Sequence, residues 1–359
     1  MMKREADISE NQLLVSYGEK VCMNLLKDHT TQQNIYWATD SYADLGEEFT
    51  FYAPITLDKI TSYISDEGVV ATKEQYDAII KQTPEARLCY QEMIRPRAVK
   101  SKQEQTQRAK DKAEVFTPAW ICNAQNNLID EAWFGRKDVF NHENADHTWT
   151  DTTEPIVFPE GKTWKDYVSD RRLEITCGEA PYITSRYDTT TGEAISVGHR
   201  IGLLDRKLRI VSENTTQSGE WLEWAQKALK STYAYEWQGD SLLLAREALL
   251  VSFIEYHCAK FGHMPSISSI DDVAVIVSWN VWQMDGLKGV VPGTCSEKKE
   301  RTNTLWDGIQ ETVKPCTGCK SGRIKEHIGD YCYIKDWDTT DPATGENGLA
   351  IRFIDLLQQ

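Results

Sequence analysis

The chain has 359 residues, of which 40% are hydrophobic and 26% are charged, a balance typical of a folded globular protein and not of a disordered one. Asp and Glu total 55 against 40 Lys and Arg, and the net charge of −15 excludes a protein that coats nucleic acid through its overall charge. The sequence contains no run of about 18 apolar residues, so no transmembrane helix is expected.

The N-terminal residues and the cysteines bear on where the protein resides. The opening stretch, MMKREADISENQ, has charges but no apolar core behind them, unlike a secretory signal. The nine cysteines, an odd number, are scattered singly except for Cys316 and Cys319. This usage indicates reduced thiols in a reducing compartment. We therefore expect a cytoplasmic protein without a membrane partner.

The N-terminal segment, residues 1–112, is predicted to combine helical and irregular structure. Residues 8–26 carry apolar side chains at helical spacing. The segment ends in a basic stretch, residues 94–112, within a chain that is otherwise acidic. Such a stripe can contact DNA phosphates, and a solvated, partly helical linker is the alternative. The candidate DNA-binding residues are Arg95, Arg97, Lys100, Lys102 and Arg108.

The central part of the chain, residues 113–295, alternates strand-like and helical patterns. The apolar runs in RRLEITCGEAPYI, STYAYEWQ and DDVAVIVSWNVW predict three buried strands. SGEWLEWAQKAL and the long apolar stretch GDSLLLAREALLVSFIEYHCAKF predict helices between them. This order predicts an α/β fold with a mostly parallel sheet flanked by helices, whose ligand lies beyond the carboxyl ends of the strands.

Two of the turns at these strand ends carry residues suited to a nucleoside ligand. Gly178 follows the first strand and would let the backbone approach a ligand closely, although an ordinary structural turn is the alternative. Glu236 ends the second strand, where a carboxylate can accept hydrogen bonds from both ribose hydroxyls, and Trp237 could pack against a purine. An ordinary carboxylate at the end of a strand explains Glu236 equally well.

The third turn contains an amide between aromatic residues. Asn280 follows the apolar run and lies between Trp279 and Trp282. An amide oxygen can accept from the exocyclic amine of a flipped base while a ring stacks on it. The alternative is a helix cap beside two core tryptophans.

These segments, in this order, resemble the adenine-specific DNA methyltransferases of restriction–modification systems. EVFTP is similar to the Phe-Thr-Pro element of that family, LEITCGEAPYI to its Asp-Pro-x-Cys-Gly-x-Gly motif, and AYEWQGDSLLLARE to its second motif. The chain as a whole resembles bacterial and phage proteins labelled restriction endonuclease subunit M. The resemblance implies a Rossmann-like methyltransferase fold, double-stranded DNA as a partner, and a restriction or specificity subunit as a further one.

The resemblance also implies roles for individual residues. Asn280 and Trp282 would be catalytic. S-Adenosylmethionine would be bound by Phe116, Thr117, Pro118, Cys177, Gly178, Glu179, Glu236 and Trp237. The sequence lacks the Pro-Pro pair of the family's catalytic motif and has Ile175-Thr176 where Asp-Pro is usual. A catalytically degenerate relative, which binds DNA, cofactor or a partner subunit without methyl transfer, is therefore the alternative function.

A C-terminal module, residues 296–359, carries a candidate metal site in CTGCKSGRIKEHIGDYC. Its spacing is Cys-x2-Cys-x7-His-x4-Cys, and three thiolates with one imidazole make a closed tetrahedral zinc site. A reduced Cys-x-x-Cys in a surface hairpin is the alternative. The predicted ligands of this zinc-knuckle-like module are Cys316, Cys319, His327 and Cys332.

Overall fold

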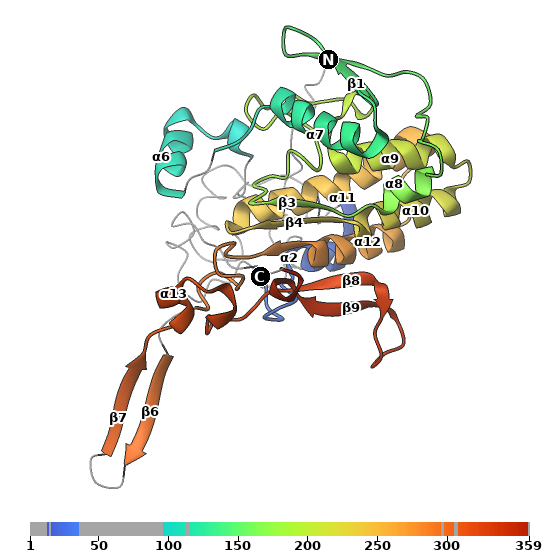
Figure 1. Cartoon of the computed structure of the whole chain (residues 1–359). Helices are drawn as coiled ribbons and strands as arrows, with labels where there is room; N and C mark the ends of the chain where they lie inside the picture. Colours follow the sequence, from blue (N-terminus) through green and yellow to red (C-terminus); the bar gives the residue numbers. More distant parts are fainter. Residues whose placement is uncertain are drawn as a thin grey trace, which may run out of the picture.

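A three-stranded parallel sheet lies at the centre of the chain (Figure 1). The structure is a computed structural model, and it describes residue 13 and residues 16–35, 96–112, 115–295, 298–304 and 308–357. The strand order of the sheet is β3-β4-β5, so strands that follow one another in sequence are also neighbours in the sheet. The strands of this sheet are β3 (Arg172–Ile175), β4 (Thr232–Glu236) and β5 (Val281–Gln283).

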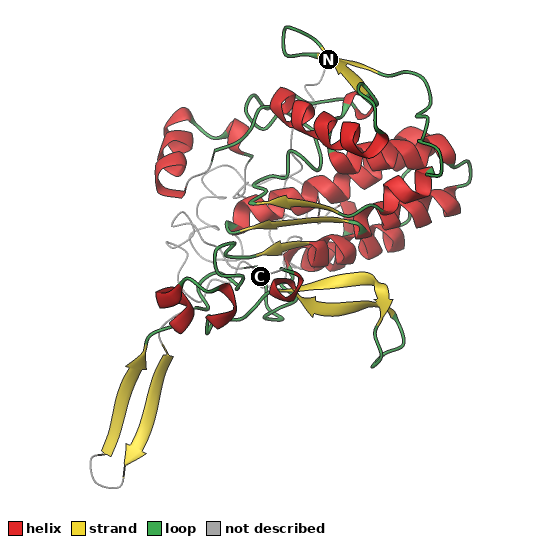
Figure 2. Ribbon diagram, in the orientation of Figure 1, coloured by secondary structure: helices red, strands yellow, loops and turns green. Residues whose placement is uncertain are grey.

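The remaining strands form two-stranded antiparallel hairpins. They are β1 (Asn141–Glu143) with β2 (Trp149–Asp151), β6 (Lys298–Thr304) with β7 (Gly308–Lys314), and β8 (Tyr333–Thr340) with β9 (Asn347–Arg352). Figure 2 shows the β6–β7 hairpin extending away from the helices and from the parallel sheet. The chain is therefore a mixed α/β protein whose predicted parallel sheet is confirmed, though the sheet is small.

Helices make up most of the rest of the described chain. The α-helices are α2 (Glu19–Leu26), α6 (Lys102–Lys112), α7 (Ala119–Phe134), α8 (Trp164–Ser169), α9 (Leu203–Asn214), α10 (Ser218–Lys230), α11 (Gly239–Phe261), α12 (Ile267–Asn280) and α13 (Thr317–Ser321). Short 3-10 helices are η2 (Arg97–Val99), η3 (Val197–His199), η4 (Ile324–Glu326) and η5 (Phe353–Leu356). Within the described parts, none of these helices has the length and apolar character that crossing a bilayer requires.

The third predicted strand is mostly helix, so the prediction of a strand over DDVAVIVSWNVW was wrong. Helix α12 begins after Ser266, whose side chain accepts from the Ser269 amide, and continues to Asn280. Only residues 281–283 of that run are extended. A short run that is apolar all round does not distinguish a buried helix from a buried strand, because both bury every face. Here α12 packs against α2, α10 and α11, so tertiary contacts decide for helix.

The two faces of the sheet are covered differently. The helices that connect β3 to β4 and β4 to β5 share one hydrophobic core with α2 and α7. Right-handed crossovers between strands in sequential order place their helices on the same face, which explains that single core. On the other face Tyr233, Tyr235 and Trp282 pack against Phe353 and Ile334 from the C-terminal hairpin region.

Three consecutive charged residues on α9 are almost fully buried. Arg206 donates to Asp130 at 2.5 Å, Asp205 accepts from the Ser185 amide at 2.7 Å, and Lys207 donates to the Asp170 carbonyl at 2.5 Å. Buried charges are tolerated where they are paired or hydrogen-bonded. These contacts give the Asp-Arg-Lys run a structural role within the core.

His29, just beyond α2, makes the stability of the fold sensitive to acid. Its Nε2 lies 2.8 Å from the Ser278 hydroxyl and its ring stacks on Trp279. Burial, with help from the charges of Arg246 and Lys27, lowers the pKa of His29 from 6.5 to about 3. The unfolded chain therefore takes up a proton near pH 6.5 that the folded protein does not accept until about pH 3.

We expect the free energy of unfolding to fall as the pH drops below about 6.5, by up to about 1.4 kcal/mol per pH unit from this residue. His29→Gln should reduce the loss between pH 7 and pH 5 by about 2 kcal/mol in urea unfolding. Equal pH slopes for His29→Gln and the parent protein would contradict this assignment.

Candidate functional site

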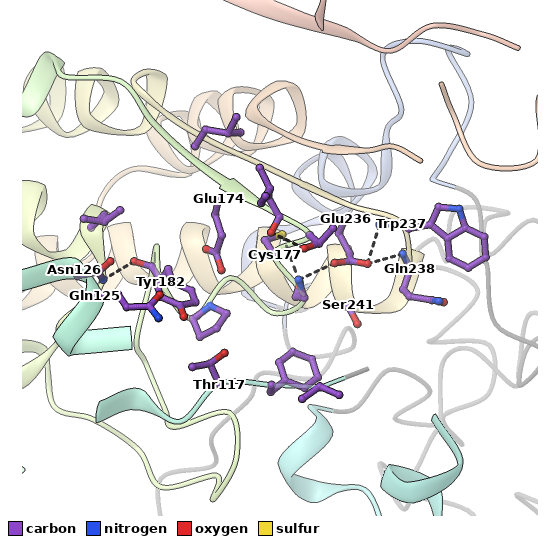
Figure 3. A pocket seen from close by; sticks show the side chains of 18 of the residues that line it. Thr117, Gln125, Asn126, Glu174, Cys177, Tyr182, Glu236, Trp237, Gln238 and Ser241 are labelled. Atoms are coloured by element: carbon purple, nitrogen blue, oxygen red, sulfur yellow. Dashed lines mark hydrogen bonds between the residues drawn. The ribbon is translucent and has the colours of Figure 1, made fainter. Parts of the chain in front are cut away.

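A cavity of about 800 Å³ opens at the carboxyl ends of β3 and β4 (Figure 3). Phe116 and Thr117, in the segment before α7, form one wall, and Asn126 on α7 contributes from the same side. The turn after β3 and the turn after β4 also line the cavity. Parallel α/β sheets bind ligands at this edge, because the loops that follow the strands converge there.

The two turns are joined through the carboxylate of Glu236. Its Oε2 accepts from the Gly178 amide at 2.8 Å, and its Oε1 accepts from the amides of Trp237 and Gln238 at 2.8 and 3.0 Å. Burial raises the pKa of Glu236, and the three amides oppose that rise. The structure thus brings Gly178 and Glu236, which are 58 residues apart, to one rim of the sheet.

The loop after β3 has an unusual backbone that depends on glycine. Thr176, Gly178 and Ala180 all have positive φ, at 48°, 56° and 58°. A Cβ added at Gly178 would lie 2.5 Å from Cε1 of Phe116, which is closer than carbon atoms approach. Gly178 therefore permits both the left-handed turn and the contact with the Phe116 ring.

The described lining of the cavity presents hydrogen-bond acceptors and no cationic side chain. None of the described residues that line it is Lys or Arg. Buried acceptor atoms without a hydrogen-bond partner among the described residues are Oδ1 of Asn126, Oε2 of Glu174 and Oε1 of Gln238. Burial raises the pKa of Glu174 well above its usual range, despite the amides of Tyr182 and Ile183. The lining suits a ligand with amino or hydroxyl donors, and none of its described side chains is a cation that could neutralise a phosphate.

Two residues predicted to bind the cofactor lie outside this lining. Pro118 caps the N-terminus of α7 and is not part of the cavity wall. Glu179 is 2% exposed, and its carboxylate accepts from the Arg97 amide at 2.7 Å and from the Tyr187 hydroxyl at 2.6 Å. The left-handed turn at Gly178 directs Glu179 away from the cavity, so this part of the prediction is corrected. Cys177 does line the cavity, and burial raises the pKa of its thiol well above the usual value.

Asn280, the predicted catalytic amide, is at the opposite end of the sheet. It is the last residue of α12 and precedes β5, whereas the cavity lies beyond the carboxyl ends of the strands. Its Nδ2 donates to the carbonyls of Leu229 and Thr232, and its Oδ1 accepts from Trp337 at 2.7 Å. Every polar group of this buried side chain is used within the protein, so a catalytic role for Asn280 is excluded.

Trp282 also lies away from the cavity. It is within β5 on the sheet face opposite the helical core, with its ring 5.1 Å from that of Phe353 and 5.6 Å from that of Tyr235. The strand was expected to end before Trp282, but it begins at Val281 because the preceding residues are helical. The error in the secondary structure thus explains the error in the predicted catalytic pair.

The basic stretch lies beside the first turn of α11. Arg108 pairs with Asp240 at 2.5 Å, and Lys100 lies 3.9 Å from the same carboxylate. Lys102 is exposed, and the guanidinium of Arg97 lies over the Phe116 ring. Arg95 is outside the described residues. Two of the cations are thus directed at Asp240, and DNA contacts by this stretch stay a prediction.

Near the C-terminus four metal-ligating side chains converge. The sulfur and nitrogen atoms of Cys295, Cys316, Cys319 and His327 all lie within 4.8 Å of one another. This cluster could bind zinc. Burial opposes ionisation of Cys316, but the amides of Cys319 and Ile328 donate to its sulfur, and its pKa falls to about 6. Burial and the neighbouring sulfurs raise the pKa of Cys319 to about 11.

The predicted fourth ligand, Cys332, is wrong, and Cys295 takes its place. Cys332 is fully buried in the second hydrophobic cluster, where its thiol donates to the Gln283 carbonyl at 3.2 Å. Cys295 precedes the β6–β7 hairpin and Cys316 follows it. A hairpin returns its two ends to the same place, and this signal could have identified Cys295 in the sequence.

Both candidate sites are built from segments that lie far apart in the chain, so neither forms a contiguous motif. The cavity joins segments around residues 116, 178 and 236, and the metal cluster joins Cys295 to His327. Comparisons with models of protein families, with curated proteins and with solved structures found no match to this chain.

Proposed function

We propose that the chain binds S-adenosylmethionine in the cavity beyond β3 and β4 and serves as the modification subunit of an adenine-specific DNA methyltransferase. The observation that carries the proposal is the Gly178–Glu236 hydrogen bond at the rim of a cavity large enough for a nucleoside. In a Rossmann-like arrangement, a glycine turn after one strand and an acid after the next hold a nucleoside cofactor.

The polarity of the cavity supports this cofactor over phosphorylated ones. S-Adenosylmethionine carries a sulfonium, an amino group, a carboxylate, a ribose diol and an adenine amine. Its net charge is positive, and it carries no phosphate. Side chains with acceptor oxygens, among them Thr117, Asn126 and Glu174, line the cavity and can accept from such donors. A dinucleotide or nucleotide triphosphate would instead bring phosphates to a lining whose described residues include Glu174 and Glu236 and no lysine or arginine. Uncompensated charge of one sign in a buried site is costly.

Methyl transfer itself needs little acid–base chemistry, because the thioether that leaves the sulfonium is neutral. The protein must hold the adenine amine, the methyl carbon and the sulfur in line. The burial of Asn280 favours a second candidate, in which the chain binds the cofactor and transfers no methyl group by itself. Both candidate functions use the same cofactor site. They differ in whether the chain itself holds an adenine base in position for methyl transfer.

Trp237 offers the sharpest test of cofactor binding. It lines the cavity and is 37% exposed, so its ring is available to stack on adenine. Trp237→Ala should weaken S-adenosylmethionine binding by about 1–3 kcal/mol, or about 5- to 150-fold in Kd, in calorimetric titration. Trp120 is the matched control, because it is 38% exposed on α7 and does not line the cavity. Trp120→Ala should leave the affinity unchanged.

The same protein then separates the two candidates. Transfer of a radiolabelled methyl group to adenine in double-stranded DNA would support the methyltransferase, and binding without transfer would support the second candidate. If the parent protein gives no heat of binding with S-adenosylmethionine, or binds ATP in its place, both candidates fail.

A further inference from the structure

The four side chains of the C-terminal cluster are arranged as the ligands of a single ion. The sulfur of Cys295 lies 3.5 Å from that of Cys316 and 3.8 Å from that of Cys319. Nδ1 of His327 lies 3.5, 3.5 and 3.7 Å from the sulfurs of Cys295, Cys316 and Cys319. All of these distances fall in a narrow range, although the residues come from three separate turns.

That range is the one a tetrahedral zinc site requires. With Zn–S bonds of about 2.3 Å and a Zn–N bond of about 2.05 Å, tetrahedral angles place two sulfurs about 3.8 Å apart and a sulfur and nitrogen about 3.6 Å apart. The observed separations agree with these values to within about 0.3 Å. Three thiolates and a neutral imidazole complete the coordination, so the site is closed to substrate and structural in type.

The surrounding backbone is shaped to hold the ligands in place. The amide of Cys319 donates to the sulfur of Cys316, so a hydrogen bond already orients that ligand. A Cβ at Gly318 would lie 2.6 Å from the backbone nitrogen of His327, and one at Gly329 would lie 2.9 Å from Cys295. Both glycines therefore allow the turns to approach each other closely enough for the four ligands to meet.

The cluster also lies at the base of the β6–β7 hairpin, where a bound ion would connect separate segments of the chain. Cys295 precedes β6 and Cys316 follows β7, so an ion between them joins the two ends of the hairpin. The loop that carries His327 pairs with the main fold, since the Val291 amide donates to the Asp330 carbonyl at 2.8 Å. The ion would thus fix the base of a hairpin that otherwise extends away from the sheet (Figure 1).

We propose that Cys295, Cys316, Cys319 and His327 bind one structural zinc ion, which closes the base of the β6–β7 hairpin and fastens it to the loop after η4. Binding replaces the thiol protons with the metal and releases them to solvent. Zinc binding does not involve the cofactor cavity, so the zinc proposal can be tested independently of the proposed function.

The test measures the metal content of the full chain purified under reducing conditions, by elemental and native mass spectrometry. We expect about one zinc per chain in the parent protein. Cys295→Ser should lose the zinc, whereas the matched variant Cys332→Ser, at the cysteine favoured by the linear spacing, should retain it. Cobalt in place of zinc should give the intense visible absorption of a tetrahedral thiolate site, and Cys295→Ser should abolish it.

A second measurement covers the case in which the buried Cys332→Ser variant does not fold. Treating the parent protein with a chelator should expose Cys295, Cys316 and Cys319 to alkylation together, while Cys332 stays unreactive. Retention of a full equivalent of zinc by Cys295→Ser would overturn the ligand assignment. A metal-free parent protein whose mass shows a Cys295–Cys316 disulfide would overturn the site, as would alkylation that the chelator does not change.

Discussion

Replacing Arg206 with methionine is expected to lower the free energy of unfolding by about 3–5 kcal/mol, measured by urea denaturation. Arg206 and Asp130 are both about 1% exposed, and the pair lies 2.5 Å apart. Asn123 and Asn127 accept from the same guanidinium at 2.9 and 2.8 Å. Removing the cation leaves the Asp130 carboxylate buried, with the Tyr167 hydroxyl as its one side-chain donor among the described residues. An uncompensated buried charge is strongly destabilising, which sets the size of the expected loss.

An exposed ion pair supplies the control for that experiment. Arg323 pairs with Glu326 at 2.8 Å, but its side chain is 74% exposed, so solvent screens the attraction. Arg323→Met should therefore leave the free energy of unfolding nearly unchanged. If Arg206→Met also leaves it nearly unchanged, the buried pair of Arg206 on α9 and Asp130 on α7 does not stabilise the fold.

Gly178→Ala is expected to combine a loss of stability with a loss of cofactor affinity. The left-handed backbone at Gly178 costs an L-residue about 1–2 kcal/mol, and the new Cβ would meet the Phe116 ring at 2.5 Å. Displacing that ring should add about 1–3 kcal/mol of overpacking and change the wall of the cavity. We expect S-adenosylmethionine binding to weaken by at least about tenfold in calorimetric titration, since one wall of the site moves.

Gly262 separates the effect of the backbone from that of the clash. It has a similar φ of 77° at the C-terminus of α11, and a Cβ there would have no neighbour within 4 Å. Gly262→Ala should lose only the backbone contribution and keep full cofactor affinity. Phe116→Leu combined with Gly178→Ala should recover part of the lost stability. Equal losses for Gly178→Ala and Gly262→Ala would show that the Phe116 contact has no energetic consequence.

Local sequence patterns were sufficient where an element has a distinctive period or boundary. The alternation in STYAYEWQ predicted the central strand, and the long apolar run that follows predicted α11, which is buried on nearly all sides. The same reasoning failed for residues 271–280, because a run of Val, Ile and Ala with no polar face fits either a strand or a buried helix. The packing of α12 between α2, α10 and α11 decided that case.

The candidate sites divide in the same way. The order of strand, turn and strand was enough to anticipate that Gly178 and Glu236 meet, because parallel strands present their carboxyl ends at one edge. Asn280 could not be placed correctly, since a helix in place of a strand moves that residue from one end of the sheet to the other. For the metal cluster, linear spacing favoured Cys332, but the spacing does not show which thiols face one another.

The sequence by itself determined the α/β class, the parallel strands at its centre, the two turns that meet at the cavity and three of the four clustered ligands, since each follows from local periodicity or short spacing. Only the tertiary structure decided that the Asn280 amide makes all of its hydrogen bonds inside the core, that Arg108 pairs with Asp240, and that Cys295 completes the Cys/His cluster. The first two outcomes depend on contacts between residues more than 50 positions apart in the chain, and no local pattern encodes such contacts. The position of Cys295 depends on the β6–β7 hairpin, which the sequence analysis did not identify.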